Sequence, residues 1–168
     1  LTAIDGRLRM HSLLSWVAAA LTGDPEFVQN ITDAAASGMF DLRVGSWSEP
    51  ITEVVGGGRL MLPGVSLAPE VVGIHPGSGA AVFTPVGDQQ AALLGAGIGE
   101  GVTAFNISTG GQVARLEHEH AGDHCQTRPF FGGLMLHTRT HLPAGRALTQ
   151  GVALLSRGRA DEEAWRWA

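Results

Sequence analysis

The sequence predicts an α/β protein, and three observations carry this expectation. Hydrophobic residues make up 44% of the 168 residues, enough to bury one good core, and no apolar run reaches transmembrane length. An apolar, β-prone segment at 80–84 is followed by a helix that begins near Asp88. Several strand candidates follow between residues 102 and 140, separated by turn-forming residues.

The part of the chain before Asp88 predicts short helices, turns and one strand. Leu8–Leu21 has broad apolar coverage and predicts a core helix that Gly23 ends. Thr32–Arg43 predicts a short capped helix that runs into a strand, and Ile51–Val55 predicts a helical turn. Residues 80–84 predict a buried strand.

Asp88 lies where this strand gives way to a helix. Asp is a preferred helix N-cap because its carboxylate accepts unpaired backbone N–H groups, and the helix dipole favours its charged form. Gln89 and Gln90 place two amides beside it at the open end of a strand, where α/β proteins bind ligands. A capping Asp88 without chemistry is the alternative interpretation.

The second half predicts a β-meander followed by a helix. The candidate strands are Val102–Ser108, Gln112–Leu116, Gln126–Phe131 and Leu134–Thr140. Thr109-Gly110-Gly111 predicts a hairpin turn, in a Gly/Ser/Thr-rich segment suited to holding phosphate oxygens. Leu148–Leu155 predicts the helix. Glycines between residues 95 and 101 predict a boundary between two domains, 1–100 and 101–168.

Composition excludes several classes of function. The net charge of −5 argues against a nucleic-acid partner. All eleven basic residues are Arg, which excludes chemistry that needs a lysine, such as a P-loop or a Schiff base. Phosphate chemistry would therefore use backbone amides, hydroxyls and a metal ion. A single cysteine, Cys125, and an opening without a signal peptide predict a cytoplasmic protein with no membrane partner.

Four strings, taken in order, resemble the FGGY carbohydrate kinases of the actin-like ATPase superfamily. They are Thr32–Arg43 with Trp47, Gly87-Asp88-Gln89, Asn106–Gly110 and Gly145-Arg146-Ala147. The resemblance implies a ribonuclease H-like (actin-like ATPase) fold. Residues 1–100 would be the C-terminal part of the first, sugar-binding domain. Residues 101–168 would open the second, nucleotide-binding domain with the β-meander. Asn106–Thr109 with Gln112, and Arg128-Pro129-Phe130, are similar to the sedoheptulokinase branch.

The resemblance implies an ATP-dependent kinase for a sugar, a ketose such as sedoheptulose. Asp88 would act as general base on a sugar hydroxyl, and Gln89 would hydrogen-bond the sugar beside it. Thr109 and Gly110 would hold the ATP phosphates. Gly145 would let the backbone approach the nucleotide, and Thr149 would add a polar contact. Mg²⁺ would bridge the phosphates with Asp88 near its water shell, so no residue is assigned as a direct metal ligand.

Two other functions stay open from the sequence. The resemblance spans residues 1–155 but only the middle of the family's length, without the N-terminal phosphate hairpin or the adenosine-binding half. The chain could therefore be a non-catalytic remnant that binds a sugar or a protein, with self-association or a complementary chain covering exposed sheet edges. A zinc site in His118–Cys125 is a third hypothesis, although its spacing matches no familiar zinc pattern and a solvated loop is the simpler expectation.

Overall fold

The computed structural model describes residues 2–4, 6–25, 28–119 and 125–155. Its helices alternate with short strands, which confirms the predicted α/β class. The helices are α1 (Leu13–Thr22), α2 (Ile31–Ala36), α3 (Glu49–Val55), α4 (Asp88–Gly95) and α5 (Gly145–Leu155), with 3₁₀ turns at Gly57–Arg59 and Phe131–Gly133. In the described ranges, no helix has the length and apolar character needed to span a bilayer.

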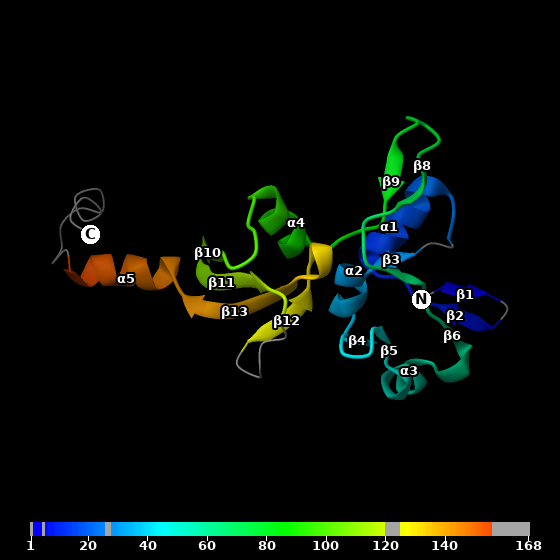
Figure 1. The fold of residues 1–168 in the computed structure, drawn as a ribbon, viewed down its shortest axis with the longest axis horizontal. Helices are drawn as coiled ribbons and strands as arrows, with labels where there is room; N and C mark the ends of the chain where they lie inside the picture. The colour runs from blue at the N-terminus through cyan, green and yellow to red at the C-terminus, as the bar shows by residue number, and fades with distance from the viewer. Residues whose placement is uncertain (1, 5, 26–27, 120–124, 156–168) are drawn as a thin grey trace.

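The strands before α4 form small sheets. They are β1 (Thr2–Ile4), β2 (Arg7–Arg9), β3 (Gln29–Asn30), β4 (Phe40–Asp41), β5 (Ser46–Trp47), β6 (Leu60–Met61), β7 (Val65–Ser66), β8 (Val71–Ile74) and β9 (Ala81–Phe83). The strands β1, β2 and β6 form one sheet, and the pairs β3–β7, β4–β5 and β8–β9 form three more. The pairs β2–β6 and β3–β7 are parallel. Figure 1 shows these elements gathered at the N-terminal side, with a longer sheet and α5 extending away from them.

Helix α1 confirms the predicted end but corrects the predicted start. Gly23 ends the helix with φ 76°, a left-handed conformation that glycine adopts without a steric penalty. The helix starts only after Ser12, whose hydroxyl accepts the Ser15 N–H at 3.0 Å. The residues before it, predicted as its first turn, instead form β2, because Leu8 and Arg9 pair with β6.

The prediction that α1 is a core helix is also corrected, because its large apolar residues are exposed. Its buried residues are Ser15 and Ala18, whereas Leu13 and Trp16 are 76% and 56% exposed. The helix packs on β8 and β9 through small side chains, and a Cβ on Gly73 of β8 would come within 2.6 Å of the Thr22 methyl group. This close approach selects the small-residue face of α1 and leaves its large apolar residues outside.

Strand β9 is not the buried strand that its composition predicts. Ala81 is exposed and Phe83 is 55% exposed. The reason is that β9 pairs only with β8, so the two strands form a ribbon with α1 on one side. Apolar composition alone does not distinguish such a ribbon from a central strand.

A four-stranded antiparallel sheet follows α4. Its strands are β10 (Thr103–Ile107), β11 (Gly110–Glu117), β12 (Gln126–Pro129) and β13 (Met135–Pro143). Their order is β10-β11-β13-β12, so the predicted meander is wrong: β13 lies between β11 and β12. Pro129 explains the edge position of β12, because proline has no N–H to give to a second neighbour.

The main core lies on this sheet. Leu116 and Leu136 are fully buried, and they cluster with the buried residues Ala114 and Phe130. Leu93 of α4 packs against this cluster, as does Ile98 just after the helix. Helix α4 therefore lies on the sheet, which fixes the direction in which its first residues point (Figure 1).

Candidate functional site

The start of α4 differs from the sequence prediction by one residue. Gly87, with extended backbone angles, occupies the N-cap position, and Asp88 is the first helical residue. The Asp88 carboxylate makes no capping bond across the first turn; its Oδ1 accepts the N–H of the adjacent Gln89 at 2.7 Å. Asp88 is exposed, and its carboxylate accepts one N–H of the first turn. The prediction that Asp88 is the N-cap residue is therefore wrong by one position.

The three residues around Asp88 are each bonded to another part of the protein. The Gly87 N–H donates to the Thr32 hydroxyl at 3.0 Å. The Gln89 amide nitrogen donates to the Thr138 hydroxyl at 3.2 Å. The Gln90 amide nitrogen donates to the Pro129 carbonyl at 3.1 Å, and Gln90 is 2% exposed. Gln89, which we expect to contact a sugar, thus has its amide nitrogen engaged with β13 in this structure.

Two hollows of about 790 and 810 Å³ share Ile107 as a lining residue, and Asp88 lines the second of them. The Asp88 hollow is bounded by α4 and the β10–β11 pair. Asn106 and Gln112 line it as well, and they are cross-strand partners. Sequence reasoning placed both in a phosphate-binding segment and did not assign them to Asp88. The available signal was two amides opposite each other across a hairpin.

The second hollow forms where the β10–β11 turn meets the start of α5. The turn is closed by the Ser108 N–H, which donates to the Gly110 carbonyl at 2.9 Å. The Gly145 N–H donates to the Ser108 carbonyl at 2.9 Å, and the Arg146 N–H donates to that of Thr109 at 3.3 Å. A Cβ on Gly145 would overlap the Ser108 carbonyl oxygen. The close backbone approach expected at Gly145 is thus made to the protein's own turn.

The candidate nucleotide-binding residues converge on this second hollow. Thr109, Gly145 and Thr149 line it, and Gly110 follows Thr109 at the start of β11. The Thr149 hydroxyl donates to the Gly145 carbonyl at 2.9 Å, so its lone pairs remain available. Arg146 also lines the hollow and is exposed. Its permanent positive charge suits phosphate, a role that the sequence motif alone did not assign.

The residues of this site fit a Mg²⁺ ion that is held mainly by the phosphates of a bound nucleotide. Within the described residues, no three side chains of His, Cys, Asp or Glu are grouped to hold a metal ion. Mg²⁺ usually keeps several waters and is held by one or two carboxylates together with substrate phosphates. The single exposed carboxylate of Asp88 matches that mode, with the ion held mainly by a bound nucleotide.

The proposed zinc segment lies partly outside the described residues, since residues 120–124 are among those not described. Of its described members, His118 pairs with Glu100 at 3.5 Å, and both side chains are largely exposed. The Glu119 carbonyl is bonded to the buried His137 ring through Nε2 at 2.8 Å. His137 therefore anchors this segment to β13 through one nitrogen, and its other nitrogen lies 3.2 Å from the Thr127 hydroxyl.

A buried carboxylate lies in α2, beside the Thr32 tether. Asp33 is 5% exposed, and its Oδ2 accepts the Ser12 hydroxyl at 2.7 Å. Burial raises the pKa of Asp33, and the Ser12 hydrogen bond opposes that change. The bond joins α2 to the start of α1, so Asp33 helps to hold α2, the helix that carries Thr32, in place.

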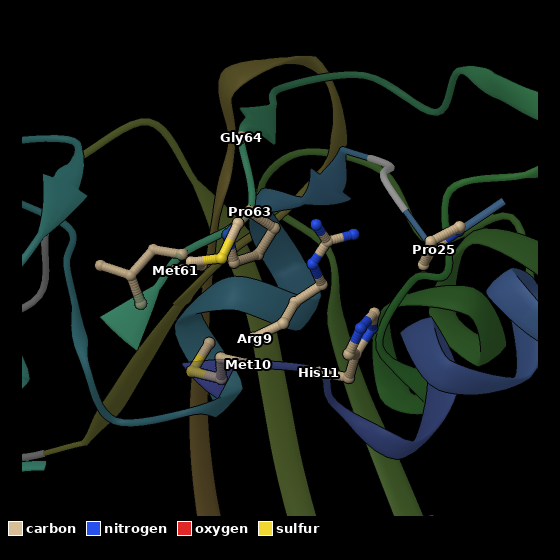
Figure 2. A pocket seen from close by; sticks show the side chains of 8 residues that line it. Arg9, Met10, His11, Pro25, Met61, Pro63 and Gly64 are labelled. Atoms are coloured by element: carbon tan, nitrogen blue, oxygen red, sulfur yellow. The ribbon is translucent and has the colours of Figure 1, made fainter. Parts of the chain in front are cut away.

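A third, smaller hollow of about 230 Å³ lies near the N-terminal strands. Figure 2 shows the Arg9 and His11 side chains extending into the space between Pro25 and the Met61–Gly64 segment. Burial lowers the pKa of His11, and the neighbouring Arg9 charge lowers it further. Among the residues that the structure describes, no carboxylate lines this hollow.

Fold and site together define an α/β protein with an acid at a helix start, facing a hollow that adjoins a glycine- and hydroxyl-rich turn. Comparison with known families identifies that class further. Residues 4–95 match the model of the FGGY family of carbohydrate kinases, N-terminal domain. The match covers more than half of the chain, so the chain belongs to this family.

Individual relatives agree with this assignment. A glycerol kinase of Solidesulfovibrio magneticus is 34% identical over 113 residues, covering 64% of this chain and 23% of the relative. A glycerol kinase of Pseudomonas putida is 31% identical over 122 residues, covering 67% of this chain and 24% of the relative. The chain thus spans about a quarter of the length of these curated relatives.

Solved structures share the fold. The xylulose kinase of Rhodospirillum rubrum superposes with a TM-score of 0.75 at 20% identity, covering 91% of this chain and 33% of that chain. The Plasmodium falciparum glycerol kinase with ADP gives a TM-score of 0.66 at 18% identity, covering 88% and 32%. These neighbours have the fold of the actin-like ATPases, which confirms the expected fold class.

Proposed function

We propose that this chain forms part of an ATP-dependent kinase that phosphorylates a hydroxyl group of a carbohydrate. One observation carries the proposal: Ile107 lines both the Asp88 hollow and the Thr109–Gly145 hollow. A sugar beside Asp88 and the phosphates of a nucleotide beside Thr109 would thereby occupy neighbouring spaces. Phosphoryl transfer depends mainly on such positioning and on charge neutralisation, because little covalent chemistry is required of the protein.

In the proposed mechanism, Asp88 accepts the proton of a sugar hydroxyl while that oxygen attacks the terminal phosphorus of ATP in line. The bond from that phosphorus to the bridging oxygen breaks, and ADP leaves. Gln89, Asn106 and Gln112 line the same hollow and offer amide groups for sugar hydroxyls. On the nucleotide side, Thr109 and Thr149 supply hydroxyls, Gly110 a backbone N–H and Arg146 a positive charge. When bound with ATP, Mg²⁺ neutralises phosphate charge, with Asp88 near its water shell.

We propose a small polyol or ketose as the acceptor. Relatives named glycerol kinase and xylulose kinase support this range. Sedoheptulose is the narrower proposal, supported by the resemblance of Asn106–Thr109 and Arg128-Pro129-Phe130 to that branch. Turnover of glycerol, xylulose and sedoheptulose side by side would decide among them, and a higher kcat/KM for either of the first two would overturn the sedoheptulose proposal.

We further propose that the kinase acts in the cytoplasm. We also propose that another polypeptide segment covers the exposed apolar face of α1 in the active protein. Leu13, Trp16 and Leu21 on this face are between 42% and 76% exposed. A second copy or a complementary part of a kinase would bury them. Light scattering after size-exclusion chromatography would test self-association, and a monomer at all concentrations would argue against a second copy.

The decisive test of the catalytic proposal is Asp88→Asn in the full chain. We expect sugar-dependent ATP turnover to fall by about 10²- to 10⁴-fold, because the amide cannot accept the proton. Thermal stability should change little, since Asp88 is exposed. The matched control is Glu100→Gln, an exposed carboxylate outside both hollows. Full turnover by the Asp88→Asn variant would exclude Asp88 as the base, and an inactive wild-type chain would favour a binding module instead.

A further inference from the structure

The N-terminus of α4 is held by a side chain from a distant part of the sequence. The Thr32 hydroxyl accepts the Gly87 N–H at 3.0 Å across 55 residues, and Thr32 is only 3% exposed. In many helices a Gln or Glu at the third helical position accepts this N–H itself. Here that residue is Gln90, and its amide nitrogen donates to the Pro129 carbonyl. The acceptor of the Gly87 N–H is Thr32, so this N–H is satisfied from outside the helix.

The Thr32 hydroxyl is itself fixed in orientation. It donates to Asn30 Oδ1 at 2.7 Å, and the same oxygen accepts the Thr32 N–H at 3.0 Å. Asn30 is fully buried and caps α2, so it cannot turn towards solvent. Because the hydroxyl proton points at Asn30, an oxygen lone pair points at Gly87. The result is a directed series of bonds that runs from Gly87 through Thr32 to Asn30.

The bond from Gly87 to Thr32 holds the start of α4 before Asp88, and two further bonds hold it after Asp88. Gln89 and Gln90 attach the first turn to β13 and β12, and α2 itself packs against β12. On the N-terminal side of Asp88, Thr32 is the one side chain among the described residues that is bonded to the Gly87 N–H. Loss of that bond would free the backbone directly before Asp88, while the bonds after it would remain.

We propose that Thr32, oriented by Asn30, is a positioning residue that fixes the Asp88 carboxylate in its hollow. This inference rests on the proposed kinase function. It extends that function to α2, which otherwise serves only as scaffold. A displacement of reacting groups by about 1 Å can cost on the order of 100-fold in rate, so a single buried hydroxyl is sufficient for a measurable effect.

The test is Thr32→Val in the full chain, which removes the hydroxyl and keeps the shape, with Thr32→Ser as the variant that restores it. We expect Thr32→Val to lower kcat by about 10- to 100-fold while KM for the sugar changes less than about threefold. Thr32→Ser should return kcat to within a few-fold of the wild type. The matched control is Thr52→Val in α3, whose hydroxyl donates to the Glu49 carbonyl within its own helix.

A second readout does not depend on activity. Hydrogen exchange of the Gly87 amide should be faster in Thr32→Val and close to wild type in Thr32→Ser. Unchanged Gly87 exchange, or an unchanged kcat in an active wild-type background, would overturn the proposal. So would a loss of kcat in Thr32→Val that Thr32→Ser does not restore. If the wild type is inactive while exchange responds as expected, kinase activity of this chain on its own is refuted, and Thr32 remains the residue that orders the α4 start.

Discussion

Gly145→Ala tests the contact on which the proposed nucleotide site depends. A Cβ at this position would overlap the Ser108 carbonyl oxygen, a backbone atom that cannot rotate away. The start of α5 would have to move away from the β10–β11 turn. That movement would lengthen the bond from the Gly145 N–H to the Ser108 carbonyl, now 2.9 Å, and the bond from the Arg146 N–H to the Thr109 carbonyl, now 3.3 Å.

The structure offers a matched control on the same helix. Gly151 also lies in α5, and a Cβ there would meet no atom within 4 Å. Gly151→Ala should therefore stabilise the protein by about 0.5–1 kcal/mol, because alanine loses less conformational entropy in a helix. Gly145→Ala should destabilise it by about 1–3 kcal/mol, the usual cost of overpacking. The two identical substitutions, six residues apart, are expected to have opposite signs.

Urea denaturation followed by circular dichroism would measure both free energies of unfolding. Calorimetric titration with ATP would measure the site, where we expect Gly145→Ala to weaken binding and Gly151→Ala to leave it close to wild type. A stability gain of similar size in both variants would show that α5 does not meet the turn as described. In that case, the adjoining hollows would no longer support the kinase proposal.

Two further predictions concern stability. Leu136→Ala, at a fully buried position in the sheet core, should cost about 2–5 kcal/mol in chemical denaturation, whereas Leu154→Ala, at a residue 80% exposed, should change stability by less than about 0.5 kcal/mol. Equal effects would contradict the core assignment. Asp33→Asn should raise the free energy of unfolding at pH 7. Because the folded pKa of Asp33 is raised above 3.8, the wild type loses stability as pH rises through that pKa. The advantage of Asp33→Asn should therefore vanish towards pH 3, and an advantage that is the same at every pH would refute this explanation.

The parts of the fold that the sequence predicted well are those decided by neighbouring residues. Gly23 ends α1 because its left-handed backbone is a local property, and the helix after Gly87 starts within one residue of its predicted position. The hairpin between β10 and β11 follows from its own turn residues. In each case, the chemistry that fixes the backbone lies within a few residues of the feature.

Two wrong predictions depended on partners far away in the sequence. The strand order was predicted wrongly because β13 pairs with both β11 and β12, which buries its residues Leu136 and Thr138. No pattern within β13 reveals that it has two partner strands. The face of α1 was misassigned because the helix packs closely on β8, where a Cβ on Gly73 would come within 2.6 Å of the Thr22 methyl group. Apolar periodicity shows that a helix has an apolar face, but the neighbouring element decides whether that face is covered.

The candidate site depends both on residues close together in the sequence and on partners far apart in it. The motif around Asp88 predicted the general base, yet it could not show that Gly87, Gln89 and Gln90 are each bonded to a different element. Such an arrangement holds the backbone of a helix start while leaving one carboxylate exposed to a hollow. A group that must accept a proton at a defined place gains from this arrangement, because its position is fixed before the substrate binds. The three bonds do not by themselves assign chemistry to Asp88, which stays a proposal for the Asp88→Asn variant to test. Thr32 makes the bond on the N-terminal side of Asp88, so Thr32→Val tests whether the position of that carboxylate matters.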